Sequence, residues 1–167
     1  MALDIDRHFR RGDLKRYTMQ CGLAGLVVLV LLLVLDAVTQ TVLIAALGAS
    51  AFIAFAVPRS PHSGPRHMIG GYVAGIFAGS LMAILKTLID VSAISDHAVM
   101  VIFGAIAISL AMFTMVVTRT EHPPAAALAL GLVLNEWNLL TLIVVLAGVI
   151  GLSVIKQLTM PALLDLI

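Results

Sequence analysis

One charged stretch in an otherwise apolar sequence carries the side chains best suited to chemistry. It reads TRTEHPPAAALALG, over residues 118–131. Its charged or titratable members are Arg119, Glu121 and His122. The residue before a proline avoids the helical region, whereas proline suits the first helical position, so a helix should begin at Pro123 or Pro124. Backbone N–H groups at a helix start lack partners within the helix and favour anions. The pattern therefore predicts a site for a small anion.

The groups expected to contact the anion surround that helix start. Alanine side chains leave the backbone amides of Ala125 and Ala126 uncovered, and Arg119 or His122 would add positive charge beside them. His122 would also carry or sense a proton, because histidine is the side chain that titrates near neutral pH. Ser50, in the stretch LGASAFIAF, would add a hydroxyl. The complete predicted substrate-binding set is Arg119, His122, Pro123, Pro124, Ala125, Ala126 and Ser50.

Each of these residues also has an ordinary structural interpretation. Thr120 would cap a helix at the membrane surface, and Glu121 would pair with Arg119 or Arg66. His122 would bond a backbone carbonyl, and Ser50 would bond its own helix backbone. The residues alone leave both interpretations open.

A second polar loop, PRSPHSGPRH at residues 58–67, is predicted from its three prolines. Its basic or titratable members are Arg59, His62, Arg66 and His67. They would form a funnel that guides anions toward the site. The alternative is a cytoplasmic loop with its usual excess of basic residues.

The elements that position these side chains are expected to be membrane helices. Of the 167 residues, 61% are hydrophobic and 11% charged, against roughly 25% charged in soluble domains. This composition excludes a soluble domain and places the chain in a lipid bilayer. Six apolar runs follow one another, at residues 19–35, 40–57, 68–85, 98–118, 123–134 and 139–155. We expect an all-α membrane protein with six transmembrane helices, the second and fifth short or broken, since the fifth is only about 18 Å long.

The basic residues predict the orientation, because they collect on the cytoplasmic side of membrane proteins. If all six runs cross and the N-terminus is inside, Lys86 is the only basic residue outside. The nine on the inner side are Arg7, Arg10, Arg11, Lys15, Arg16, Arg59, Arg66, Arg119 and Lys156. We expect a bacterial inner-membrane protein with a cytoplasmic N-terminus. A cleaved signal peptide is not expected, because no small-residue site leads into a polar domain.

A short internal sequence repeat suggests two inverted halves. The tetrapeptide VTQT, residues 38–41, returns as VTRT at residues 117–120, 79 positions later. Each copy ends a long apolar run and opens a short one. Three runs per half would make the halves inverted in the membrane, as in many transporters, whose central site uses shortened helices. Chance similarity is the alternative.

Other features predict packing rather than chemistry. Gly71, Gly75 and Gly79 recur on one helix face, which indicates a tight internal contact or the seam of a homo-oligomer. Trp137 is typical of an interfacial anchor, and Asn135 would line an exit. The single cysteine, Cys21, forms no internal disulfide. We expect no cofactor, no metal, no nucleic-acid partner and no catalytic residue.

The ordered motifs resemble the HPP family of integral membrane proteins. The motif that names the family is His122-Pro123-Pro124 here, and residues 47–79 resemble its Gly-Ala-Ser-Ala segment, its Ser-Pro and Pro-Arg loop and its Ile-Gly-Gly. His67 departs from the polar amide of many relatives. The resemblance covers roughly residues 20–158. It divides the chain into a cytoplasmic segment, a transmembrane domain and a C-terminal tail, at residues 1–18, 19–158 and 159–167. The soluble CBS region that some relatives carry is not expected.

The resemblance implies transport of a small anion. Relatives in plastids and cyanobacteria are associated with nitrite transport, so nitrite is the leading candidate. A passive channel for small solutes and a non-transporting membrane scaffold stay open as alternatives. A membrane-embedded enzyme is the least favoured, because no catalytic constellation stands out.

Overall fold

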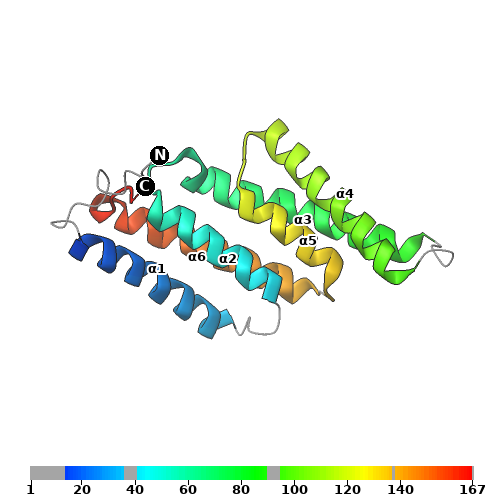
Figure 1. The fold of residues 1–167 in the computed structure, drawn as a ribbon, viewed down its shortest axis with the longest axis horizontal. Coiled ribbons are helices and arrows are strands. Elements are labelled where there is room, and N and C mark those ends of the chain that lie inside the picture. The colour runs from blue at the N-terminus through cyan, green and yellow to red at the C-terminus, as the bar shows by residue number, and fades with distance from the viewer. Residues whose placement is uncertain (1–13, 36–40, 90–94, 137, 167) are drawn as a thin grey trace, which may run out of the picture.

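The computed structural model describes residues 14–35, 41–89, 95–136 and 138–166, with the backbone alone at 14, 16, 17, 31–35 and 41–43. These residues form six α-helices and two short 3-10 helices (Figure 1). In chain order they are α1 Leu14–Leu35, α2 Thr41–Ala56, η4 Pro61–Ser63, α3 Pro65–Leu88, α4 Asp96–Thr118, α5 Pro123–Leu134, α6 Leu139–Thr159 and η5 Met160–Ala162. The prediction of an all-α fold with six helices is confirmed. Some predicted features lie outside the described residues: Arg7, Arg10, Arg11, Trp137 and most of the VTQT repeat at residues 38–41.

The helices differ in whether they can cross a bilayer. Within the described part of the chain, three helical stretches are long and apolar enough: Pro65–Leu88, Asp96–Thr118 and Leu139–Ala162. The shorter apolar helices are Thr18–Val30 within α1, Ile44–Ala56 within α2, and Pro123–Leu134. A core about 30 Å thick needs roughly 20 helical residues. The 12 residues of α5 span about 18 Å, so α5 is a partial span, as predicted.

Local sequence signals explain most helix ends. Pro123 opens α5, as predicted. Arg119 ends α4 in the left-handed conformation, with φ 54°, and its N–H bonds the last turn of the helix. After the far end of α5, Asn138 and Thr141 form a capping box at the start of α6.

Some predicted boundaries were wrong. The α3 helix begins at Pro65 rather than Met68, because a proline in a presumed loop occupies the first helical position. The first helix begins at Leu14, inside the presumed N-terminal segment. The C-terminal tail packs against the bundle: the Leu166 N–H donates to the Ala56 carbonyl at 2.8 Å, and Gln20 Oε1 accepts from Leu164 N–H at 3.1 Å.

Consecutive helices run antiparallel, and α5 lies in the middle of the bundle (Figure 1). It contacts α2, α3 and α4. The glycine face of α3 permits this close approach, because a Cβ at Gly71 would lie 2.6 Å from His122 Cβ and one at Gly79 would lie 2.7 Å from the Ala129 carbonyl oxygen. A Cβ at Gly75 would meet the Ala125 carbonyl. The glycine face is therefore an internal contact.

Candidate functional site

His122 sits at the start of α5 and is fully buried. Its backbone is extended, with φ −142° and ψ 95°, which turns the chain from α4 into α5. The ring is held at both nitrogens. Nδ1 lies 3.0 Å from the His62 carbonyl oxygen, and Nε2 lies 2.8 Å from Ser50 Oγ. The predicted site histidine and the predicted site serine therefore touch, although 72 positions separate them.

Tyr72 completes a buried polar cluster with them. Its hydroxyl lies 2.9 Å from Ser50 Oγ, and its ring centroid lies 5.7 Å from that of His122. Ser50, Tyr72 and His122 each show essentially no exposed surface. They come from α2, α3 and the start of α5. We call these three residues the polar cluster.

The polar cluster lies inside the bundle rather than at its edge. Gly71, which faces His122, comes six residues after Pro65, and Ser50 comes six residues before Ala56. Each interval corresponds to about 9 Å of helix. Ser50 and Tyr72 therefore lie within the bundle, among residues that are otherwise mostly apolar, and His122 joins them to the loop at His62. Buried polar side chains are costly unless paired, and within membrane proteins they commonly mark functional sites.

The two polar loops meet above the polar cluster and bond each other. His62 Nδ1 lies 2.9 Å from the Glu121 carbonyl, while the His62 carbonyl accepts from His122. His67 Nε2 lies 3.6 Å from a Glu121 carboxylate oxygen. Arg66 donates to the Thr118 carbonyl at 3.1 Å. These contacts, which we call the loop latch, close the bundle over His122.

The structure corrects three expectations about this turn. The Ala125 amide is not free: it donates to the His122 carbonyl at 2.9 Å, and Ala125 is fully buried against α3. Thr120 does not cap α5, because its hydroxyl lies 2.7 Å from that of Thr118 and the start of α5 has no side-chain cap. Glu121 pairs with His67 rather than with Arg119 or Arg66.

The remaining predicted residues divide by exposure. Arg59, Arg66, Arg119 and His62 are exposed at the loop end of the bundle, and His67 is half-buried. Pro123 is exposed, Pro124 is buried and Ala126 is half-buried. Arg119 therefore lies outside the polar cluster, which leaves His122 as the group able to carry positive charge within it. No group of three or more His, Cys, Asp or Glu side chains in the described chain could hold a metal ion.

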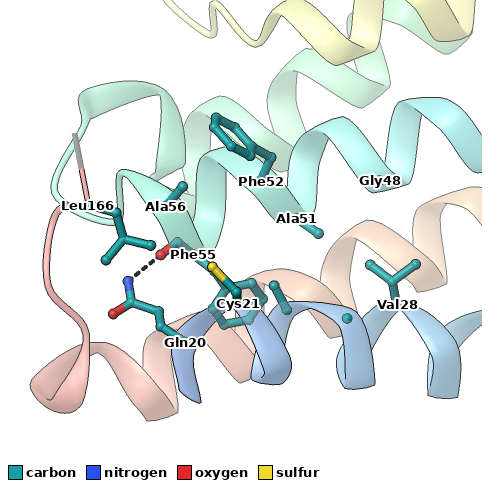
Figure 2. Close-up of a pocket in the computed structure, with 11 residues that line it drawn as sticks. Gln20, Cys21, Val28, Gly48, Ala51, Phe52, Phe55, Ala56 and Leu166 are labelled. Carbon is teal, nitrogen blue, oxygen red and sulfur yellow. Dashed lines mark hydrogen bonds between the residues drawn. The ribbon is translucent and has the colours of Figure 1, made fainter. Parts of the chain in front are cut away.

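Of the cavities lined by described residues, two bear on the predicted site, and both lie apart from the polar cluster. One of about 440 Å³ runs between α1 and α2, lined by Gln20, Phe52 and Phe55 among others, with Leu166 at one end (Figure 2). Its lining has no charged side chain, so an anion would find no charged partner there. Another of about 560 Å³ lies at the far end of α5 and is lined by Lys86 and Asn135 among others. Asn135, predicted to line an exit, thus borders a cavity whose lining is mostly apolar.

Tyr72 was missed by sequence reasoning. It belongs to the stretch GYVAGIFAG, which was interpreted only as a glycine packing face. A tyrosine two residues into a glycine-rich apolar run was the available signal, because a phenolic hydroxyl usually needs a hydrogen-bond partner when buried.

The fold and its long apolar helices together define an all-helical integral membrane protein. The chain belongs to the HPP family, since the model of the HPP transmembrane region matches residues 10–162. No solved structure matches the chain.

Two curated relatives are transmembrane proteins of Dictyostelium discoideum. One is 36% identical over 117 residues, which cover 68% of this chain and 38% of the relative. The other is 33% identical over 88 residues, which cover 53% of this chain and 26% of the relative. The chain therefore spans well under half the length of these relatives.

Proposed function

We propose that this protein transports a small inorganic anion across a membrane, with nitrite the leading substrate. The observation that carries the proposal is the polar cluster, three fully buried polar side chains held at the start of a partial-span helix. Membership in the HPP family supports a membrane role. The choice of nitrite rests on the resemblance of the motifs to relatives associated with nitrite transport.

The polar cluster suits an anion with a few acceptor atoms. Ser50 and Tyr72 carry hydroxyl donors, and His122 Nε2 becomes a donor when protonated. The start of α5 adds a partial positive charge, equivalent to about half an elementary charge at a helix N-terminus. Ala126 and the two prolines shape this turn, while the Ala125 amide serves the helix rather than the anion. Nitrite would bind by displacing contacts within the polar cluster.

The basic residues at the loop end would raise the local concentration of anions. Arg59, Arg66 and Arg119 are exposed there, whereas Lys86 lies at the other end, where it donates to the Val133 carbonyl at 2.8 Å. This charge asymmetry supports a cytoplasmic location for the loop end. The location we propose is the bacterial inner membrane.

Alternating access would use two inverted halves, α1–α3 and α4–α6. The paired helices have similar lengths, 22 and 23, 16 and 12, and 24 and 21 residues. They run in opposite directions (Figure 1). If α1, α2 and α3 are exchanged with α4, α5 and α6, each of the main helix contacts has a counterpart. The α3–α5 contact corresponds to α6–α2, α3–α4 to α6–α1, and α4–α5 to α1–α2. The contacts α2–α5 and α3–α6 each correspond to themselves. This correspondence supports transport by rocking of one half against the other.

Uptake of nitrite into vesicles containing purified protein tests the proposal. We expect saturable uptake above that of protein-free vesicles. His122→Ala should abolish it at any ionic strength, because His122 belongs to the buried site. Arg119→Ala should weaken uptake only at low salt, because exposed charges are screened over roughly 8 Å at physiological ionic strength. Uptake equal to that of protein-free vesicles, or unchanged in His122→Ala, would refute the proposal. Flux of water or neutral solutes instead of anions would indicate a channel.

A further inference from the structure

The hydroxyl of Ser50 can form a hydrogen bond with His122 whether the imidazole ring is neutral or protonated. A carbonyl oxygen only accepts hydrogen bonds, so His122 Nδ1, 3.0 Å from the His62 carbonyl, carries a hydrogen. When the ring is neutral, Nε2 is therefore an acceptor. Ser50 then donates its hydroxyl hydrogen to Nε2 at 2.8 Å, and Tyr72 donates to Ser50 Oγ at 2.9 Å.

A proton on Nε2 is accommodated by rotation of one hydroxyl group. Protonated Nε2 donates to Ser50 Oγ, and the serine hydrogen turns to the Ala46 carbonyl, which lies 3.0 Å from Oγ. Tyr72 keeps its bond, because a hydroxyl oxygen can accept two hydrogens. Every polar atom keeps a partner, and no heavy atom has to move.

A charged His122 would nevertheless lack a counter-ion. No carboxylate in the described part of the chain forms a salt bridge with it. The titratable groups that face the ring are Tyr72 and His67 from α3 and His62 from η4, and the neighbouring Glu121 pairs with His67. Leaving an isolated charge buried costs several kcal/mol. An anion alone in this site would carry the corresponding penalty.

We propose that the anion and a proton cross together, with the proton held on Nε2 of His122. This inference rests on the proposed transport of an anion by the polar cluster. The anion supplies the negative charge that the imidazolium lacks, and the imidazolium supplies the positive charge that the anion lacks. Each therefore strengthens the binding of the other, as linkage requires. One proton and one monovalent anion enter from one side and leave on the other, so a cycle moves no net charge.

Simultaneous measurement of nitrite uptake and internal pH tests the coupling. Vesicles with purified protein are prepared in alkaline buffer, with a pH dye inside and the membrane potential set by potassium and valinomycin. We expect one proton per nitrite, faster uptake into a more alkaline interior, and no dependence on potential. Protein-free vesicles give the background, because neutral nitrous acid crosses lipid unaided. Nitrite uptake without proton entry, driven by the potential, overturns the inference.

The assignment to His122 is tested by nitrogen NMR of protein with ¹⁵N-labelled histidine. The His122 signal is identified by its absence from the spectrum of His122→Gln. Added nitrite should move that signal in the wild type from the neutral-ring to the charged-ring position, and should leave the exposed His97 unchanged. If the His122 signal stays neutral in saturating nitrite, the assignment is wrong, whether or not the variant transports. Absence of any nitrite uptake or binding by the wild type would instead refute the proposed function itself.

Discussion

Ser50 holds the polar cluster together, because its hydroxyl contacts both Tyr72 and His122. A serine within a helix commonly bonds only the carbonyl four residues earlier, and Ser50 has that partner too, in Ala46. The structural interpretation of this residue is thus correct but incomplete. What distinguishes Ser50 from a lipid-facing serine is burial beside a histidine and a tyrosine.

Replacing Ser50 by alanine should weaken nitrite transport strongly. The change removes a hydroxyl donor to the anion, and a hydrogen bond to a charged group contributes about 1.5–3 kcal/mol. We expect the KM for nitrite to rise roughly tenfold or more, since about 1.4 kcal/mol corresponds to a factor of ten. Initial uptake rates over a range of nitrite concentrations measure this.

The matched control is Ser109→Ala. Ser109 is exposed on α4 and bonds the Ala105 carbonyl at 3.0 Å, so it shares the helical contact of Ser50 without the polar cluster. It should leave the KM unchanged. Equal KM values in both variants would contradict a substrate-contacting role for Ser50.

At the scale of elements, the position of α5 determines the site. The short helix can lie among α2, α3 and α4 because glycines on α3 leave room for its backbone. Its first turn meets Gly71 and Gly75, and this contact holds His122 beside Ser50 and Tyr72. The glycine face would thus serve the proposed function through packing.

Gly75→Ala should destabilise the protein, because the new Cβ would meet the Ala125 carbonyl in the backbone of α5. Overpacking of this kind costs about 1–3 kcal/mol. Gly48→Ala is the control, since a Cβ there has nothing within 4 Å, and alanine is intrinsically the better helix former by about 1 kcal/mol. Thermal midpoints in detergent, read by size-exclusion chromatography, should fall for Gly75→Ala and stay or rise for Gly48→Ala. Two unchanged midpoints would show that α5 is not packed this tightly.

Sequence reasoning located α5 better than its surroundings. The proline pair fixed its start and the polar residues from Asn135 its end, so its bounds at 123–134 were predicted correctly. Tyr72 and the pairing of Ser50 with His122 could not be predicted, because they depend on which helices touch. The Ala125 amide was assigned wrongly for two reasons: its N–H donates to the His122 carbonyl of its own turn, and α3 covers the first turn of α5.

At the scale of the whole molecule, the alternating helices place all described arginines and lysines except Lys86 near one end. The loop latch joins the two connections at that end, and the cavity beside Lys86 lies at the other. The two ends of the molecule therefore differ in both charge and closure, and the proposed path would cross the bundle between them.

Cysteine labelling from either side of the membrane tests this arrangement. In a Cys21→Ala background, Arg59→Cys and His97→Cys introduce exposed thiols at opposite ends of the bundle. A membrane-impermeant reagent should label Arg59→Cys from the cytoplasmic side and His97→Cys from the other side. Labelling of both thiols from the same side would contradict the crossing order on which the proposed path depends.

Equilibrium binding of ¹⁵N-nitrite to the purified protein in detergent tests the central claim most directly, because it separates recognition by the polar cluster from movement across the membrane. Saturable binding is expected for the wild type and for Ser109→Ala, with binding strongly weakened in Ser50→Ala and lost in His122→Ala. Thermal midpoints of the same samples show that each variant is folded. Saturable binding of equal strength in all four folded proteins would show that the polar cluster is not the anion site.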